Sequence, residues 1–231
     1  MMIRYEYSTR IFNNDNFYVT ALFDGTLSKA KAASELRNIQ RIISHFPVHS
    51  KLKLASLQRK QKAIVNLLLD VHGHQILNNG LFNGDPHPGN FLMLSDGRLG
   101  LIDYGQCKVL EKDKRLTLIK LVKELGLSRV DNKAVEAAMY DFGYRFQNSN
   151  ATAIQSLAEF VFDSDSCSRA AGYTNPQEYY QQLQQLNPCK NMPDEAVLVA
   201  RTSFLIRGMG ALLGVNVETS KSWSRIIIEH P

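Results

Sequence analysis

The pattern of apolar and polar positions predicts a chain that begins with strands and continues mainly as helices. Residues 6–12 and 17–23 are rich in aromatic and β-branched side chains and flank four turn-forming Asn and Asp residues. This arrangement predicts a β-hairpin. A second hairpin is expected from residues 91–94 and 99–102, because the Ser-Asp-Gly-Arg segment between them supplies a tight turn.

Helical periodicity covers most of the remaining sequence. Helices are expected over residues 28–46 and 54–79, the second of them ending at Gly80. Further helices are expected to begin at Asp113, Asp131, Asn175-Pro176 and Pro193, since each start carries a capping residue or a proline. The positions expected to face the core are Ile64, Leu67, Leu68, Val71, Leu116, Ile119, Val122, Leu125, Val135, Ala138, Met139, Phe142, Val197, Ala200 and Phe204.

Composition places the chain among ordinary globular proteins and excludes several classes. The 231 residues are 44% hydrophobic and 21% charged, which argues against disordered, collagen-like and disulfide-scaffold proteins. Cys107, Cys167 and Cys189 lie far apart without a C-x-x-C pair, so neither a cysteine zinc site nor a disulfide framework is expected. No apolar stretch is long enough to span a bilayer. The first residues resemble no signal or transit peptide, and we expect the natural N-terminus to precede Met1.

The segment from Leu81 to Asn90 is the strongest candidate for chemistry. It is polar, contains two prolines and two glycines, and lies between a long helix and a hairpin. Prolines restrict the backbone, so the loop should be stiff and should present Asp85, His87 and Asn90 in fixed positions. The hairpin that follows ends in Asp103-Tyr104-Gly105, where an Asp terminates an apolar strand.

The spacing of these residues matches a phosphoryl-transfer site. Protein kinases place a catalytic Asp five positions before a metal-binding Asn, and a short hairpin then delivers a second metal-binding Asp. Here Asp85 precedes Asn90 by five positions, and Asp103 lies thirteen further on. Asn90 and Asp103 would hold Mg²⁺ against nucleotide phosphates, and Asp85 would face the attacking hydroxyl or water. The alternative is a loop whose polar residues merely cap turns, which the joint spacing disfavours.

The sequence LFNGDPHPGNFLMLSDGRLGLIDYGQ closely resembles the ABC1/ADCK/UbiB family of atypical kinases, which carry D-P-H-P-G-N followed by L-I-D-[FY]-G-Q. The resemblance implies a protein-kinase-like fold, ATP and Mg²⁺ as cofactors, and ATPase activity more than protein phosphorylation. It implies that Asp85 is catalytic and that Asn90 and Asp103 bind metal and nucleotide. Pro86, His87, Pro88, Gly89 and Gly105 are expected to shape the loops, while Gln106 matches the motif without an assigned role. Weaker similarity covers residues 6–9, residues 19–25 as a hinge, and the Arg207-Gly208 helix.

The resemblance also sets the expected architecture. We expect an α+β, mostly helical fold: a kinase-like large lobe over residues 26–231, with family-specific C-terminal helices, preceded by a small-lobe remnant and hinge over residues 1–25. The K-x-G-Q signature, the alanine-rich loop and the strand lysine of the family are not found in these residues. The 231 residues alone are therefore expected to hydrolyse ATP weakly or not at all. The alternative function is a non-catalytic pseudokinase-like scaffold that binds a protein partner or lipid.

Other patterns are explained more simply. The basic run Lys51, Lys53, Arg59, Lys60 and Lys62 is expected to be a solvated helix face, with an anionic membrane surface or acidic partner as the alternative. His72 and His74 diverge on a helix and cannot chelate together. Gly210 and Gly214 suit close helix packing within the fold. The net charge of 27 − 22 = +5 is a mild basic excess, consistent with binding phosphates or a membrane surface but diagnostic of neither. No nucleic-acid partner is expected. The resemblance adds quinone-biosynthesis proteins as partners and a mitochondrial or plastid location.

Overall fold

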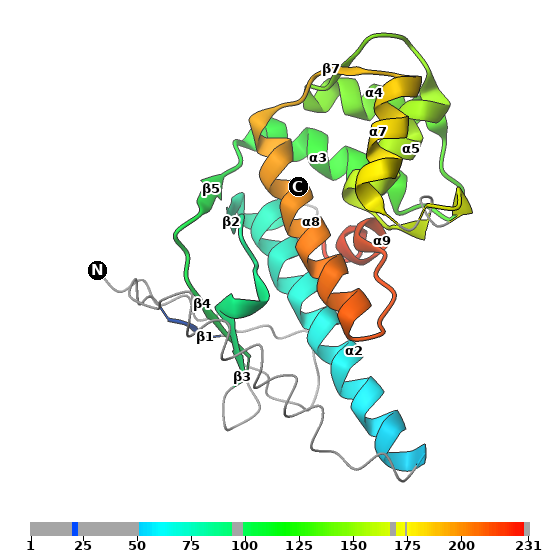
Figure 1. Cartoon of the computed structure of the whole chain (residues 1–231). Coiled ribbons are helices and arrows are strands. Elements are labelled where there is room, and N and C mark those ends of the chain that lie inside the picture. Colours follow the sequence, from blue (N-terminus) through cyan, green and yellow to red (C-terminus); the bar gives the residue numbers. More distant parts are fainter. Residues whose placement is uncertain (1–19, 23–50, 94–98, 167–169, 174, 229–231) are drawn as a thin grey trace.

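The computed structural model describes residues 20–22, 51–93, 99–166, 170–173 and 175–228. Helices dominate this part of the chain, and short strands join them (Figure 1). The prediction of a mostly helical α+β fold is confirmed. In chain order the elements are β1 (Thr20–Leu22), α2 (Lys51–His74), the π-helical turn η1 (Gln75–Asn79), β2 (Leu81–Asn83), the 3₁₀ turn η2 (Pro88–Asn90), β3 (Phe91–Met93), β4 (Leu99–Ile102), β5 (Cys107–Val109), α3 (Lys112–Leu125), α4 (Asn132–Phe142), β6 (Arg145–Phe146), α5 (Ala151–Phe162), α7 (Pro176–Leu186), β7 (Cys189–Asn191), α8 (Asp194–Leu212) and α9 (Thr219–Ser224).

The helix ends follow the sequence signals. The helix predicted over residues 54–79 is present as α2 and η1, and Gly80 ends it with a left-handed φ of 72°. The Asp131 side chain accepts a hydrogen bond from the Lys133 N–H at the start of α4, and Asn175 caps α7 in the same way. The helix predicted over residues 28–46 lies outside the described residues.

Three small sheets are present in the described chain. β3 and β4 form the predicted hairpin, with Phe91 opposite Leu101, and β1 lies parallel to β4 on its other side. The strand expected over residues 17–23 is described at Thr20–Leu22, where it pairs with β4. Its predicted partner, residues 6–12, lies outside the described residues. The antiparallel ladders β2–β5 and β6–β7 were not predicted, because strands of two or three residues leave no readable alternation.

The core has two parts. The larger part joins α3, α4, α5, α7 and α8 around the fully buried Trp223 of α9. The smaller part lies between α2, the β3–β4 hairpin and the C-terminal half of α8, and α2 and α8 lie against each other along it (Figure 1). This smaller part supports the hairpin that follows the candidate catalytic loop.

Most predicted core positions are confirmed, and two are wrong. All four positions of α4 are buried: Val135, Ala138, Met139 and Phe142. Leu116 and Val197 were expected in the core but are 52% and 47% exposed. In α3 the buried stripe runs through Leu118, Leu121, Val122 and Leu125 instead, because α4 and α9 both pack against that side of the helix.

The remaining patterns have structural outcomes. Arg59, Lys60 and Lys62 are exposed on α2, as expected for a solvated face. A Cβ at Gly210 would come within 2.5 Å of Val217, so Gly210 packs closely against the loop that follows α8 rather than against another helix. Gly214 lies beyond the end of α8 and adopts a positive φ instead. Within the described residues, no helix is both long enough and apolar enough to cross a bilayer.

Candidate catalytic and metal-ligand site

The β2–β5 ladder holds the two candidate loops together. β2 leads directly into the loop that carries Asp85, and β5 follows the turn that carries Asp103. Beyond the ladder, the Gly84 N–H donates to the Gln106 carbonyl at 2.9 Å. A Cβ at Gly84 would lie 3.2 Å from that carbonyl oxygen and from Leu198, so the close approach of the loops favours glycine here. Segments about twenty residues apart are thus fixed side by side.

Asn83 ties the two loops to each other. Its buried side chain accepts a hydrogen bond from the Asp85 N–H at 2.9 Å and donates one to the Asp103 carbonyl at 3.0 Å. The sequence analysis did not single out this residue. A polar side chain at the end of an apolar strand was the available signal, because a buried amide must find partners.

Backbone hydrogen bonds and prolines make the candidate catalytic loop stiff. The His87 N–H donates to the Asp85 carbonyl at 2.7 Å, and the Asn90 N–H donates to the His87 carbonyl at 2.8 Å. His87 Nδ1 accepts from the Gly89 N–H at 3.1 Å. Pro86 and Pro88 restrict the backbone on either side of His87. The loop therefore presents its side chains with little freedom to reorient.

Asn90 and Asp103 are placed at the same end of one hairpin. Phe91 pairs with Leu101, so Asn90, which precedes β3, and Asp103, which follows β4, lie at the same end of the hairpin. The Asn90 Nδ2 donates to the Asp85 carbonyl at 3.2 Å, which fixes the orientation of the amide. Asn90 thus contacts the Asp85 backbone, and Asn83 contacts the Asp103 backbone. Both contacts belong to one small region of the fold.

Asp103 has an unusual backbone. Among the described residues it is the only non-glycine residue with a positive φ, 66°, and its Oδ1 accepts a hydrogen bond from the Gly105 N–H at 3.0 Å. Left-handed conformations are costly for side-chain-bearing residues and concentrate at functional sites. The Asp103 side chain is exposed to solvent at the end of an otherwise buried strand.

The Asp85 carboxylate has two side-chain partners that the local motif does not reveal. Arg201 Nη2 of α8 lies 2.8 Å from Asp85 Oδ1, and Arg201 Nη1 donates to Gln106 Oε1 at 3.0 Å. Gln106 Nε2 in turn donates to Asp85 Oδ2 at 3.4 Å. Arg201 lies 116 positions from Asp85, so only the tertiary fold brings them together.

The negative charge of Asp103 affects the pKa of the neighbouring Cys107 thiol. Partial burial, followed by the negative charge of Asp103, raises the pKa of the Cys107 thiol. Cys107 follows Gln106 directly at the start of β5.

The donor set suits a hard cation held together with phosphates. Asn90 and Asp103 offer an amide oxygen and a carboxylate, which are the oxygen ligands that Mg²⁺ prefers. In the part of the chain that the structure describes, no three His, Cys, Asp or Glu side chains gather as a metal cluster. Mg²⁺ keeps waters and takes oxygens from nucleotide phosphates, so two protein ligands suffice for it.

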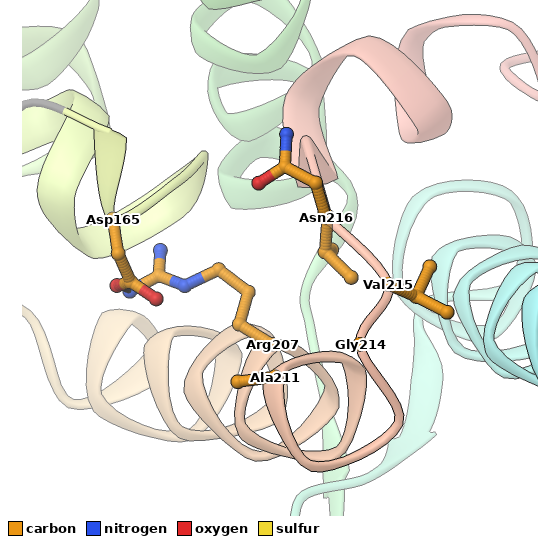
Figure 2. Close-up of a pocket in the computed structure, with 7 residues that line it drawn as sticks. Asp165, Arg207, Ala211, Gly214, Val215 and Asn216 are labelled. Carbon is orange, nitrogen blue, oxygen red and sulfur yellow. Dashed lines mark ion pairs between the residues drawn. The ribbon is translucent and has the colours of Figure 1, made fainter.

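A hollow in the described structure is lined by other residues. It has a volume of about 220 Å³ and is lined by the C-terminal end of α8, the following loop and Asp165. Figure 2 shows the Arg207 guanidinium pointing toward Asp165 at its edge, and Arg207 Nη2 lies 2.9 Å from Asp165 Oδ1. None of the catalytic-loop residues lines this hollow, and Arg207 is only 3% exposed.

Comparison with known proteins identifies the catalytic-loop region. Residues 39–139 match the family model of the ABC1 atypical kinase-like domain. This part of the chain is therefore similar to an ABC1 atypical kinase-like domain. The matched segment includes Asp85, Asn90 and Asp103, whereas Arg201 lies outside it.

Individual proteins are similar to parts of this chain. The chloroplastic protein ACTIVITY OF BC1 COMPLEX KINASE 1 of Arabidopsis thaliana is 46% identical over 48 residues, covering 21% of this chain and 7% of that protein. The probable serine/threonine-protein kinase abkB of Dictyostelium discoideum is 30% identical over 160 residues, covering 67% of this chain and 23% of that protein. The complex of Rv3197 with erythromycin from Mycobacterium tuberculosis has a TM-score of 0.47 at 20% identity, covering 77% of this chain and 48% of that one. The chain spans a quarter or less of the length of these curated relatives.

Proposed function

We propose that this ABC1 domain binds Mg·ATP and transfers its terminal phosphoryl group, as the large-lobe portion of an atypical kinase or ATPase. One observation carries the proposal: the hairpin and the hydrogen bonds of Asn83 and Asn90 hold the Asp85 and Asp103 loops in one place. The family match supports the kinase-like class. The nucleotide is proposed to bind between the hinge at residues 19–25 and the Asp103 loop.

Each polar residue has a proposed role. Asn90 and Asp103 would hold Mg²⁺, which when bound supplies positive charge against the phosphates. Asp85 would orient the attacking hydroxyl or water from the end of a loop that cannot easily move. The loop hydrogen bonds of His87 and Gly89 would keep Asp85 and Asn90 at a constant separation.

Turnover by the 231 residues alone is proposed to be slow. The sequence supplies the two metal ligands, but the phosphate-covering loop and strand lysine implied by the family resemblance are not among these residues. Aligning the phosphates and neutralising their charge account for most of the acceleration in phosphoryl transfer. Binding is therefore the property to measure first.

Calorimetric titration with ATP in the presence of Mg²⁺ tests the proposal. We expect saturable binding that is lost on adding EDTA and weakened at least tenfold by Asp103→Asn. Asp141→Asn is the matched control, because Asp141 is an exposed aspartate paired with Lys120. Equal affinity of the Asp103→Asn and Asp141→Asn variants would contradict the proposal. Binding with no turnover, even in a longer form of the protein that includes the phosphate-binding loop, would favour the non-catalytic scaffold that binds a protein or lipid.

The proposed setting is isoprenoid-quinone or lipid metabolism in a plastid. The family resemblance supports the metabolic class, and the chloroplastic relatives from Arabidopsis thaliana support the plastid over the mitochondrion. Imaging of the tagged natural protein in its own cells tests the location; a purely mitochondrial signal would contradict it.

A further inference from the structure

Helix α8 presses on the catalytic loop at two neighbouring points. Leu198 lies against Gly84, where a Cβ would meet it at 3.2 Å, and Arg201 contacts the next residue, Asp85, at 2.8 Å. Leu198 and Arg201 are three positions apart and so lie on one face of the helix. The contact of Arg201 with Asp85 is thus part of a packed interface between α8 and the loop.

The Arg201 guanidinium closes a ring of three side chains. It donates to Asp85 Oδ1 through Nη2 and to Gln106 Oε1 through Nη1, while Gln106 Nε2 donates to Asp85 Oδ2. Both oxygens of the carboxylate are therefore held, one of them by a permanent cation. Such a ring fixes the rotation of the carboxylate.

The main effect of this ring in the proposed site is to neutralise the charge of the Asp85 carboxylate. An unbalanced Asp85 carboxylate beside a nucleotide would repel its phosphates. Arg201 cancels that charge, and its side chain is 44% exposed and so partly open to solvent. Asp85 itself is 22% exposed.

We propose that Arg201 is the counter-ion and positioning residue of Asp85, so that α8 completes the nucleotide site from outside the family-matched segment. Gln106 relays the same constraint to the Asp103 turn. This inference rests on the proposed Mg·ATP binding at Asp85, Asn90 and Asp103. It adds the chemical reason that an anionic substrate is tolerated next to a catalytic carboxylate.

Charge compensation gives the decisive test, with Mg·ATP affinity of the 231-residue chain measured by calorimetry. Arg201→Gln should weaken binding roughly tenfold, because it leaves Asp85 uncompensated. Adding Asp85→Asn to Arg201→Gln should recover most of the affinity, since the pair is then neutral again. Arg201→Lys keeps the charge without the planar fork and should give an intermediate affinity. Arg129→Gln, at an exposed arginine distant in sequence from both loops, is the matched control.

The outcomes separate this inference from the function on which it rests. If the wild type binds Mg·ATP and Asp103→Asn abolishes binding, but Arg201→Gln binds like Arg129→Gln, only the role of Arg201 is overturned. The same holds if the double variant binds no better than Arg201→Gln, because a merely structural contact would not respond to restored neutrality. Absence of Mg·ATP binding by the wild type overturns both. Thermal unfolding of each variant identifies any loss of fold, and a melting temperature of Arg201→Gln far below that of Arg201→Lys would assign the residue to stability instead.

Discussion

The Asn83 side-chain amide donates a hydrogen bond to the Asp103 carbonyl at 3.0 Å, and through it the catalytic loop and the Asp103 turn are joined. The backbone of Asp103 has a positive φ of 66°. A left-handed conformation persists only where its surroundings enforce it. Asn83 on one side and the Gly105 N–H on the other supply that enforcement.

The Cys107 thiol offers a direct probe of the Asp103 charge. Since burial and then the Asp103 carboxylate raise its pKa, Asp103→Asn should lower the pKa toward its ordinary value. More thiolate then exists at pH 8, and alkylation by iodoacetamide should accelerate. Peptide mapping separates Cys107 from Cys189, whose pKa is raised by its own burial and whose rate should not change. An unchanged Cys107 rate would show that the Asp103 carboxylate lies elsewhere.

A pair of glycines tests the packing that supports the long helix α2. A Cβ at Gly73 would lie 2.5 Å from the Trp223 ring, and that ring is fully buried and donates to the Leu69 carbonyl. Gly73→Ala should therefore lower the free energy of unfolding by roughly 1–3 kcal/mol. A Cβ at Gly208 on α8 would have nothing within 4 Å of it. Gly208→Ala should therefore raise the free energy of unfolding by about 0.5–1 kcal/mol, because alanine has the higher helix propensity. Chemical denaturation of both variants checks the pair; the same sign for both would contradict this packing.

Local signals in the sequence predicted much of the fold. The α4 core positions, the caps at Asp131 and Asn175, and the β3–β4 hairpin all follow from spacing and turn chemistry within a few residues. The exposure of Leu116 could not be predicted from local signals, because it depends on which side of α3 packs against α4 and α9. The β2–β5 ladder was missed for a similar reason: its pairing depends on a contact across 24 or more residues.

The same limit applies to the site. Asp85, Asn90 and Asp103 are recognisable because their spacing is local and motif-like. The contacts of Arg201 depend on the path of the whole C-terminal half, since 116 positions separate it from Asp85. Nothing around Arg201 in the sequence distinguishes it from any other helix-surface arginine.

His72 makes the stability of the fold depend on pH. Complete burial lowers its pKa from 6.5 to about 4, despite the hydrogen bond from Nδ1 to the Leu68 carbonyl. The unfolded chain therefore binds more protons than the folded one between pH 4 and 6.5, so stability falls as the pH drops through this window. The expected loss from His72 is about 3 kcal/mol.

The variant His72→Phe isolates this contribution. It keeps an aromatic ring against Phe91 and removes the titrating group. Burial raises the pKa of Asp70 and Asp163, which act in the opposite direction, so the quantity to compare is the difference between wild type and variant. The free energy of unfolding of the wild type minus that of His72→Phe should decrease as the pH falls from 7 to 4. A constant difference would mean that His72 is not buried in its neutral form.

Arg207 is expected to stabilise the fold rather than bind a ligand. It is 3% exposed, donates to the Phe160 carbonyl at 2.8 Å, pairs with Asp165, and lies 4.4 Å from the centre of the Phe204 ring. Arg207→Met should lower the free energy of unfolding by roughly 3 kcal/mol, because Asp165 and the Phe160 carbonyl lose this partner. Lys221→Met breaks an exposed pair with Glu218 and should cost less than about 1 kcal/mol. Urea denaturation compares the two; equal losses would refute the anchoring role.

The central claim is that one divalent cation is held between Asn90 and Asp103 when nucleotide is bound. Nuclear magnetic resonance with Mn²⁺ replacing Mg²⁺ in the presence of ATP measures this most directly, because Mn²⁺ broadens nearby signals. We predict that the Asn90 side-chain amide and the Gly105 amide broaden first, while the signals of Arg207 and Asn216, which line the hollow at the end of α8, stay sharp. Broadening that begins at Arg207 and Asn216, with Asn90 and Gly105 unaffected, would contradict the account.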